Sequence, residues 1–513
     1  MVLYEIRKNA YYDSVTLMLI SKEIKALDGV TEVLVGMATE LNKELAGNLS
    51  LGSETLDELS PNDFFIAADV ENSEVMDLVV ETVNTLLTQK KANTDSVYRP
   101  VTIKAALEMV PDANMAVVSV AGQYAEDEVD RLLDENIHVM LFSDNVSVAA
   151  EKRLKEKAVE KGLLMMGPDC GTAIINGIPL AFANVVSRGP IGIIGASGTG
   201  TQEVSTLIDQ LGSGCSQVIG TGGRDLKSEI GGLMMLQSMD ALIADPETKV
   251  IVLISKPPSP EVAEKILKKV KETDKPVVVD FIGGDLTMIR NSGAVPCLTL
   301  EDTAYKAVAL ANGKAPEDFL GFELSDAEID ALVKTSVAKL KPEQKFLRGL
   351  YTGGTLADEA MKLLGPSMGA IYSNIPLQPE YMMDNLDVKG KHTCLDLGED
   401  QFTVGRPHPM IDPSTRTERM LKDIDDTVAV ALLDVVIGYG SHENPAGEVA
   451  QAIQTLNKTL KNEVIYVASI TGTSKDPQDM AASKADLESV GVIVMPSNAQ
   501  AVRLTGKLMA EIG

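Results

Sequence analysis

A glycine-rich turn between a strand and a helix is the strongest chemical signal in the sequence. The stretch PIGIIGASGTGTQEV begins as an apolar, β-branched run and passes through Ser197, Gly198 and Thr199 into a helical segment. Such a turn places backbone N–H groups at the positive end of a helix, which is a ready anion site. No lysine follows the glycines, so the Walker pattern is absent. A tight turn capped by Ser or Thr explains the same residues equally well.

A second glycine-rich stretch, GSGCSQVIGTGGRDL, follows at 212–226. It again places small residues directly after a strand, and Gly222 and Gly223 stand at its end beside Arg224. These residues could contact a phosphate or close over it. A loop that needs positive φ explains the glycines equally well.

A proline-rich segment near residue 400 carries the basic side chains best suited to grip an anion. In LDLGEDQFTVGRPHPMIDPSTR (395–416), Arg406 and His408 lie between prolines, and Arg416 follows. Prolines stiffen the backbone and favour a preset loop over a helix or strand. Arginine can hold a carboxylate or phosphate with two parallel hydrogen bonds. The alternative is a solvated turn with a surface ion pair.

A further strand-to-helix turn is predicted in VVIGYGSHENPAG (435–447). Gly440, Ser441 and His442 stand at the mouth of this turn, where His442 could donate to an anion or simply cap the helix.

Parallel sheets would position these turns, and the rest of the sequence shows the alternation of buried strands and amphipathic helices that such sheets require. Runs such as KVIVLI (249–254) and PVVVDF (276–281) are typical of strands buried on both faces. Between them, SPEVAEKILKKVKET carries an apolar stripe at helical spacing, opened by Ser259 and Pro260. The repetition predicts an α/β protein with Rossmann-like and flavodoxin-like doubly wound sheets.

Shifts in composition predict the domain boundaries. The first residues alternate strand and helix three times, which predicts a small α+β domain over 1–95, with a ferredoxin-like arrangement as one candidate. The polar stretch at 88–100 predicts a linker. The other predicted segments are a Rossmann-like domain over 100–187, a flavodoxin-like domain over 188–321, a helical linker over 322–345 and a C-terminal flavodoxin-like domain over 346–513.

Composition excludes several classes of partner. The 513-residue chain has 46 Lys and Arg against 74 Asp and Glu, a net charge of −28. Such a charge repels nucleic acid and anionic membrane, so we expect neither as a partner. Four distant cysteines without a CxxC pair predict reduced thiols and no metal site. We expect a cytoplasmic protein, because the sequence has neither a spanning apolar run nor a signal-peptide pattern.

Longer stretches resemble a known family. GPDCGTA, GASGTGTQE and ADPETKVIVLI are similar to the α subunit of succinyl-CoA synthetase, and LDLG with VGVIVMPSNAQAVRLTGKLM is similar to the ligase domain of its β subunit. With the extra N-terminal domain and GRPHPMIDPSTR, nearly the whole chain resembles the FdrA proteins. The resemblance implies a CoA-binding-like domain at 100–187, ligase-like domains at 188–321 and 346–513, and a homo-oligomer.

Residues that serve the synthetase reaction are replaced in this chain. In the synthetases a histidine in a GHAGA loop carries the phosphoryl group, whereas here Asn291 stands in that place, and an amide cannot form a phosphoramidate. Lys256 replaces the carboxylate that supports this histidine, and a lysine suits anion binding. The GxTGxxG turn for the phosphates of CoA and an ATP-grasp domain are both missing. We therefore expect no cofactor, with CoA as the alternative.

The FdrA resemblance implies a role in purine (allantoin) breakdown. There the family is thought to act with two partner proteins in an oxamate carbamoyltransferase, which interconverts oxalurate plus phosphate with oxamate plus carbamoyl phosphate. One alternative is an acyl-CoA synthetase subunit of the succinate–CoA ligase type. Another is a non-catalytic scaffold subunit.

The carbamoyltransferase hypothesis assigns a role to each candidate residue on chemical grounds. Two helix N-termini, expected at 197–201 and 440–442, would face one another and stabilise an oxyanion together with nearby cations. The assigned roles are phosphate binding by Ser197, Gly198 and Thr199, charge neutralisation by Lys256, carboxylate binding by Arg406 and Arg416, and carbonyl polarisation by His408.

Overall fold

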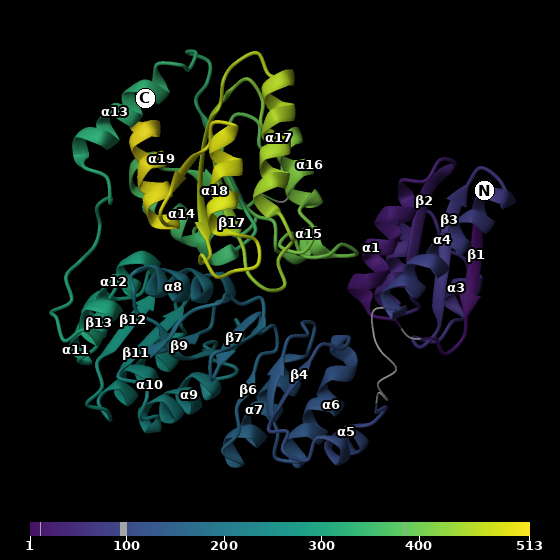
Figure 1. The fold of residues 1–513 in the computed structure, drawn as a ribbon, viewed down its shortest axis with the longest axis horizontal. Coiled ribbons are helices and arrows are strands. Elements are labelled where there is room, and N and C mark those ends of the chain that lie inside the picture. Colours follow the sequence, from purple (N-terminus) through teal and green to yellow (C-terminus); the bar gives the residue numbers. More distant parts are fainter. Residues whose placement is uncertain (11, 93–99, 384, 513) are drawn as a thin grey trace. The chain divides into compact units, whose positions relative to one another are not determined.

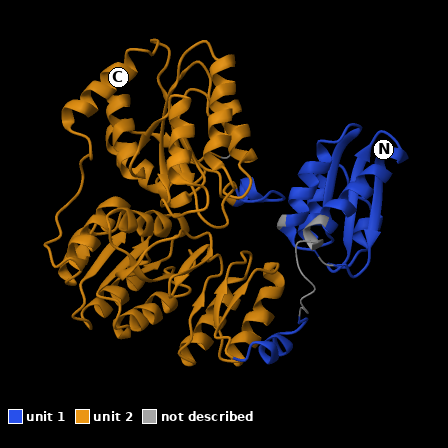
Figure 2. Cartoon of the chain, viewed as in Figure 1, with its two compact units in different colours: residues 1–111, 400–408 blue, residues 112–399, 409–513 orange. Residues whose placement is uncertain are grey.

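The computed structural model of the chain describes residues 1–513 except 11, 93–99, 384 and 513 (Figure 1). The chain divides into two compact units (Figure 2): unit 1 is residues 1–111 with 400–408, and unit 2 is residues 112–399 with 409–513. Most of the linker expected at 88–100 lies outside the described residues. None of the helices in the described part of the chain combines the length and apolar character that a membrane crossing requires.

Unit 1 is built on a three-stranded antiparallel sheet with β3 at its centre. Leu17 on the first helix and Phe64 on β3 belong to one buried cluster, and Phe65 belongs with Ala46 and Leu56 to a second cluster on the other face of the sheet. The alternation of strand and helix expected from the sequence is confirmed. The elements are β1 (Val2–Arg7), α1 (Ser14–Lys25), β2 (Val30–Met37), α2 (Glu40–Asn48), α3 (Glu54–Asp57), β3 (Phe64–Val70), α4 (Ser73–Ala92) and α5 (Ile103–Met109).

Residues 400–408 belong to unit 1 although they come late in the sequence. They hold the one-turn helix α15 (Asp400–Thr403) and the start of the GRPHP motif. Gly405 has a φ of +73°, and a Cβ at this position would lie 2.4 Å from the side chain of Leu45. Glycine is therefore required for this segment to lie against α2.

Unit 2 begins with a three-stranded parallel sheet, followed by a sheet of seven strands. The small sheet holds β4 (Met115–Val118), β5 (His138–Leu141) and β6 (Met165–Met166), with helices α6 (Gly122–Asp134) and α7 (Val148–Glu160). The large sheet has the order β13-β12-β11-β9-β10-β7-β8 and is parallel except for its β7–β8 hairpin. This hairpin lies before the boundary expected at residue 187, so the second sheet begins earlier in the chain than predicted. Its elements are β7 (Thr172–Ile175), β8 (Ile178–Ala181), β9 (Arg188–Gly195), α8 (Gly198–Gln210), β10 (Cys215–Gly220), α9 (Leu233–Ala244), β11 (Val250–Ser255), α10 (Pro260–Val270), β12 (Val277–Phe281), α11 (Leu286–Asn291), β13 (Val295–Pro296) and α12 (Leu300–Ala311).

The C-terminal part of unit 2 is a six-stranded parallel sheet in the order β15-β16-β14-β17-β18-β19. Every residue of β17 is buried, as expected for a central strand covered on both faces. Helix α13 (Asp326–Val337) precedes this sheet, in the segment expected to be a helical linker. The remaining elements are β14 (Phe346–Tyr351), α14 (Gly354–Met368), β15 (Ile371–Tyr372), η1 (Pro379–Tyr381), β16 (His392–Asp396), α16 (Ser414–Asp423), β17 (Val428–Val436), α17 (Pro445–Thr459), β18 (Ile465–Thr471), α18 (Met480–Ser489), β19 (Ile493–Met495) and α19 (Asn498–Ile512).

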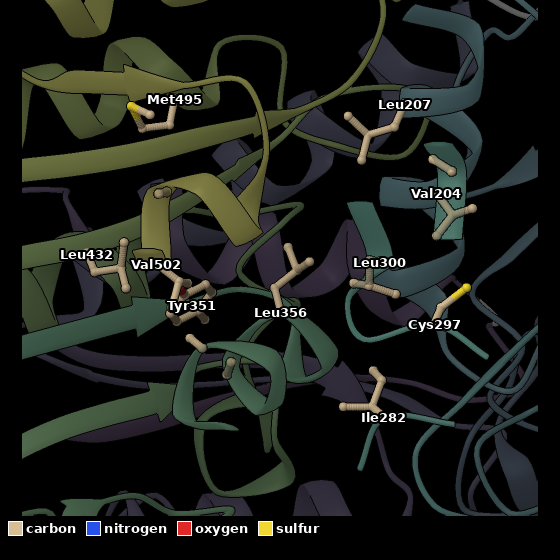
Figure 3. Close-up of a cluster of buried hydrophobic side chains, with 14 of the residues drawn as sticks. Val204, Leu207, Ile282, Cys297, Leu300, Tyr351, Leu356, Leu432, Met495 and Val502 are labelled. Carbon is tan, nitrogen blue, oxygen red and sulfur yellow. The ribbon is translucent and has the colours of Figure 1, made fainter. Parts of the chain in front are cut away.

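A single hydrophobic core joins the two large sheets of unit 2 (Figure 3). Val204 on α8 and Leu300 on α12 belong to the same buried cluster as Leu356 on α14 and Val502 on α19. All four cysteines of the chain are free thiols, as the sequence predicts, and all four are buried. The predicted α/β class with doubly wound parallel sheets is confirmed, and the shared core holds the carboxyl ends of β9 and β14 together.

Candidate functional site

The turn at the start of α8 has the structure that the sequence predicts. Strand β9 ends at Gly195, and Ser197 caps the helix by accepting a hydrogen bond from the N–H of Gly200 at 3.1 Å. Gly198 is exposed and Thr199 is half-buried, so the first turn of the helix is not closed off by the core. A capped turn and an anion site are therefore compatible here.

A second helix N-terminus meets this turn, and it belongs to α14. The hydroxyls of Ser197 and Thr355 are 2.6 Å apart, and a Cβ at Gly353 would lie 2.5 Å from the side chain of Thr199. We call residues 197–199 and 353–355 the cradle. Its two helix dipoles both present their positive ends, which favours a small anion beside this junction. The motif TGGT after the strand at 346–351 was the available sequence signal, and it was missed.

Asp434 holds the α14 side of the cradle in place. Its carboxylate accepts hydrogen bonds from the backbone N–H of Thr352 at 2.8 Å and from the hydroxyl of the same residue at 2.9 Å. Arg416 forms an ion pair with this carboxylate at 3.2 Å, and both side chains are buried. The sequence suggested that Arg416 contacts a substrate carboxylate. In the structure its guanidinium instead pairs with Asp434 inside the protein.

Asp396 is a second carboxylate at the cradle that sequence reasoning did not identify. It ends β16 and is buried, and a Cβ at Gly354 would lie 2.3 Å from its Oδ2. The N–H of Gly398 donates to its other oxygen at 2.9 Å. Burial raises the pKa of Asp396 to about 7, and the charge of Glu399 acts in the same direction. Asp396 can therefore hold or release a proton near neutral pH beside the start of α14.

Lys256 lies near these groups, but it is not a free cation. Its ammonium forms an ion pair with Asp358 at 2.7 Å, while its side chain remains 48% exposed. Burial would lower the pKa of Lys256, but the charges of Asp358, Asp396 and Glu399 raise it overall. Lys256 is thus a charged, partly accessible group whose charge is shared with Asp358.

The turn at 440–442 does not form a helix N-terminus, and that prediction is wrong. Helix α17 begins at Pro445, and Asn444 is its cap. The Nδ1 atom of His442 accepts a hydrogen bond from the N–H of Asn444 at 3.2 Å, so His442 supports the capping residue. Gly440 packs on Phe182, since a Cβ there would lie 2.7 Å from the ring. The hydroxyl of Ser441 is buried and finds no hydrogen-bond partner among the residues that the structure describes.

The loop with Gly222 and Gly223 is held by contacts with neighbouring segments of the protein. Gly222 has a φ of +83°, and a Cβ there would lie 2.3 Å from the carbonyl oxygen of Pro168, which favours the conformational explanation of this glycine. Gly223 is exposed. Arg224 forms an ion pair with Glu151 at 2.9 Å, so the guanidinium is engaged within the protein.

Arg406 and His408 lie in the segment that groups with unit 1, and their roles toward a substrate stay predictions. Arg406 is exposed and His408 is half-buried. Within the described residues, no group of three His, Cys, Asp or Glu is arranged to hold a metal ion.

Behind the cradle, buried carboxylates from several helices share one polar network. Glu203 on α8 accepts from the N–H of Asn498 at 2.9 Å and from the hydroxyl of Thr471. The amide of Asn498 donates in turn to Glu359 on α14 at 2.7 Å. Burial raises the pKa of Glu203 to about 7, and the charges of Glu359 and Glu301 add to this effect.

This network predicts that part of the stability of the fold is lost as pH rises. Between pH 4.5 and 7 the folded chain keeps the proton on Glu203 that the unfolded chain releases, so the free energy of unfolding falls across this window. Glu203→Gln removes this titration and should be more stable than the parent by about 3 kcal/mol above pH 7, with little difference near pH 4.5. Thermal melting at pH 5 and pH 8 measures the effect. Glu488→Gln on the surface is the control, and a parent protein more stable than Glu203→Gln at pH 8 would contradict the prediction.

Three family models match the chain. A model of CoA-ligase matches residues 350–508, and one of a CoA binding domain matches 186–283. A third, described as "AllF, heavy metal-associated domain", matches 1–101, a segment that contains neither Cys nor His. The CoA-binding match falls on the seven-stranded sheet, C-terminal to the range 100–187 for which this likeness was expected. Fold and matches together define a protein of the CoA-ligase type.

Similar proteins show to which family within this class the chain belongs. The uncharacterized protein YahF of Escherichia coli is 42% identical over 99% of this chain and 97% of its own length. The succinate–CoA ligase [ADP-forming] subunit alpha 2 of Archaeoglobus fulgidus is 29% identical over 37% of this chain and 67% of its own length. The malate–CoA ligase subunit alpha of Methylorubrum extorquens is 26% identical over 40% of this chain and 72% of its own length. The chain belongs to the FdrA family, which has the succinyl-CoA synthetase-like scaffold.

Proposed function

We propose that this chain is one component of an oxamate carbamoyltransferase built on the CoA-ligase scaffold. The reaction interconverts oxalurate plus phosphate with oxamate plus carbamoyl phosphate. The observation that carries the proposal is the cradle, where the N-termini of α8 and α14 meet through the 2.6 Å contact between Ser197 and Thr355. Two helix dipoles and two hydroxyls suit a phosphate or the phosphoryl end of carbamoyl phosphate.

Asp396 supports the proton transfer that this reaction requires. When a phosphate oxygen attacks the carbamoyl carbon of oxalurate, the bond from that carbon to the bridging nitrogen breaks. The nitrogen of the departing oxamate must then gain a proton, and hydrogen phosphate must lose one. A carboxyl group with a pKa of about 7 beside the cradle can donate the first proton and accept the second.

The residue at the carrier position supports a mechanism without the phosphohistidine of the synthetases. Asn291 is the last residue of α11 and is exposed, and it lies in the segment where the synthetases place their histidine. His392 opens β16 at the amino end of its sheet, away from the cradle, and His138 opens β5 of the small sheet. Direct attack by phosphate on the carbamoyl group needs no covalent carrier.

The proposal includes two partner proteins and no CoA, and a phosphate assay tests it. The chain, the partner proteins, oxalurate and inorganic phosphate are incubated together, and carbamoyl phosphate is followed by phosphorus NMR. We expect its signal only when both oxalurate and phosphate are present. Full-rate transfer by the partners without this chain would instead identify it as a non-catalytic scaffold.

A second candidate is an acid–thiol ligase activity, which the matches to CoA-ligase and CoA binding domains favour. In that case the cradle would bind the phosphate released when an acyl phosphate reacts with CoA. Incubation with ATP, succinate and CoA separates the two functions, because acyl-CoA seen by mass spectrometry, or an acid-labile phosphoprotein formed from labelled ATP, would contradict the carbamoyltransferase proposal.

A further inference from the structure

Lys362 on α14 carries a positive charge that the fold leaves without a counter-ion. Its side chain is half-buried, and its ammonium forms neither an ion pair nor a hydrogen bond with any residue that the structure describes. In the described part of the chain no lysine nitrogen is fully enclosed without a partner, so the Nζ atom of Lys362 keeps a surface that solvent can reach. This ammonium can therefore meet a ligand.

The ammonium of Lys362 lies at the carboxyl edge of the seven-stranded sheet. A Cβ at Gly283 would lie 2.9 Å from the Nζ atom of Lys362 and 3.8 Å from the ring of Pro257. Pro257 follows β11 and Gly283 follows β12, so both residues are in loops at the carboxyl ends of parallel strands. The next strand, β9, ends in the cradle at the same edge. Ligands of parallel α/β sheets bind at this edge.

Lys256 brings a second ammonium to the same stretch of α14. It directly precedes Pro257, and its Nζ atom pairs with Asp358 at 2.7 Å, one turn before Lys362. The cradle residue Thr355 lies one further turn toward the start of this helix, so about 10 Å of helix separates it from Lys362. Long side chains on a helix lean toward its N-terminus, which shortens the distance from the ammonium to the cradle.

Two buried carboxyl groups lie near Lys362 without pairing with it. Glu359 accepts a hydrogen bond from the N–H of Leu300 at 2.8 Å, and Asp280 accepts one from the hydroxyl of Thr303 at 3.1 Å. Burial raises the pKa of both carboxyl groups, that of Asp280 to about 7, so neither is a full negative charge near neutral pH. Burial also lowers the pKa of Lys362, although these two groups act against it. The ammonium thus lacks a full counter-charge, which an anionic ligand can supply.

We propose that Lys362 and Lys256 form a carboxylate subsite beside the cradle, which binds the carboxylate end of oxalurate and oxamate. This inference rests on the proposed function, in which the cradle holds the phosphoryl group. Oxalurate carries its carboxylate at the end opposite to the carbamoyl carbon that phosphate attacks, so this group needs a cation outside the cradle. Arg416 cannot supply it, because Asp434 holds its guanidinium. Lys362 supplies a full charge, and Lys256 shares its charge with Asp358.

Steady-state kinetics of the reconstituted assembly, with oxamate and carbamoyl phosphate as substrates, separate the subsite from the cradle. Lys362→Met should raise the KM for oxamate about tenfold or more, because it removes a charged partner of the carboxylate. The KM for carbamoyl phosphate should stay unchanged, since the cradle is intact. Lys362→Arg keeps the charge and should restore most of the affinity for oxamate. Lys458→Met is the matched control, because this exposed lysine lies in the last turn of α17.

Binding of oxamate to the full chain by itself supplies a readout that does not depend on the reaction. Titration calorimetry should show a Kd about tenfold higher for Lys362→Met than for the parent. The melting temperature should stay the same or rise, because methionine replaces a partly desolvated cation.

The outcomes distinguish the subsite from the proposed function. Absence of oxamate binding to the parent chain, or equal affinity of the parent and Lys362→Met, would overturn the subsite. Oxamate binding that is lost in Thr355→Val but kept in Lys362→Met belongs to the cradle and would overturn it as well. If the assembly forms no carbamoyl phosphate while oxamate binding depends on Lys362, the carboxylate subsite stands and the proposed function is wrong.

Discussion

Asp434→Ala should lower the free energy of unfolding of unit 2 by about 3–5 kcal/mol, because it leaves the buried guanidinium of Arg416 without its counter-charge. The same change removes the acceptor for the backbone N–H and the hydroxyl of Thr352 at the turn before α14. Urea unfolding followed by circular dichroism measures the loss.

Two further variants separate the ion pair from general effects of substitution. Glu488→Ala on the surface of α18 should change the free energy of unfolding by no more than about 0.5 kcal/mol. The double variant Arg416→Met with Asp434→Leu removes both buried charges and should lose less stability than Asp434→Ala alone. A double variant as unstable as the single one would show that the hydrogen bonds to Thr352, and not the charge of Arg416, dominate.

The second large effect is expected on activity. Under the proposed function, Thr355→Val should reduce kcat/KM for phosphate-dependent carbamoyl phosphate formation by about 10²–10³-fold, because it removes a hydroxyl from the cradle. Melting temperature should change little, since valine has the shape of threonine and the hydroxyl of Ser197 keeps accepting the hydrogen bond from the N–H of Gly200. The phosphorus NMR assay of the reconstituted assembly gives the rate.

Ser197→Ala extends this test and needs its own control, because Ser197 also caps α8. Loss of a serine cap costs about 1 kcal/mol of stability wherever it occurs. Ser147 caps α7 by the same hydrogen bond, at 3.1 Å to the N–H of Ala150, and has no part in the cradle. We expect Ser147→Ala and Ser197→Ala to lose similar stability, while only Ser197→Ala loses activity. Equal activities of the two variants would remove the cradle from the mechanism.

The sequence predicted the local features of the site well where neighbouring residues decide them. The turn at Ser197 was found because a β-branched run, small residues and a capping hydroxyl follow one another within ten residues. The start of α17 was predicted too early, at the glycines and His442. Asn444 and Pro445 are the stronger cap and first-turn signals, and the helix begins there. The turn at Ser197 and the start of α17 both depend on the residue types that neighbour them in the sequence.

The partners of that turn could not be predicted from neighbouring residues. Ser197 and Thr355 are 158 positions apart, and their contact depends on the core shared by α8 and α14. The same holds for Arg416, whose residue type suits a substrate carboxylate. Its guanidinium instead pairs with Asp434 once α16 packs against β14 and α17.

The sequence by itself determined the order of strands and helices, the capped turn at α8 and the replacement of the carrier histidine by Asn291, because each depends on residue type and short-range spacing. Only the tertiary structure decided which second helix faces that turn, which cations are engaged within the protein and where Asp396 gains its raised pKa. Those outcomes depend on desolvation and on contacts between segments far apart in the chain, which no local pattern encodes.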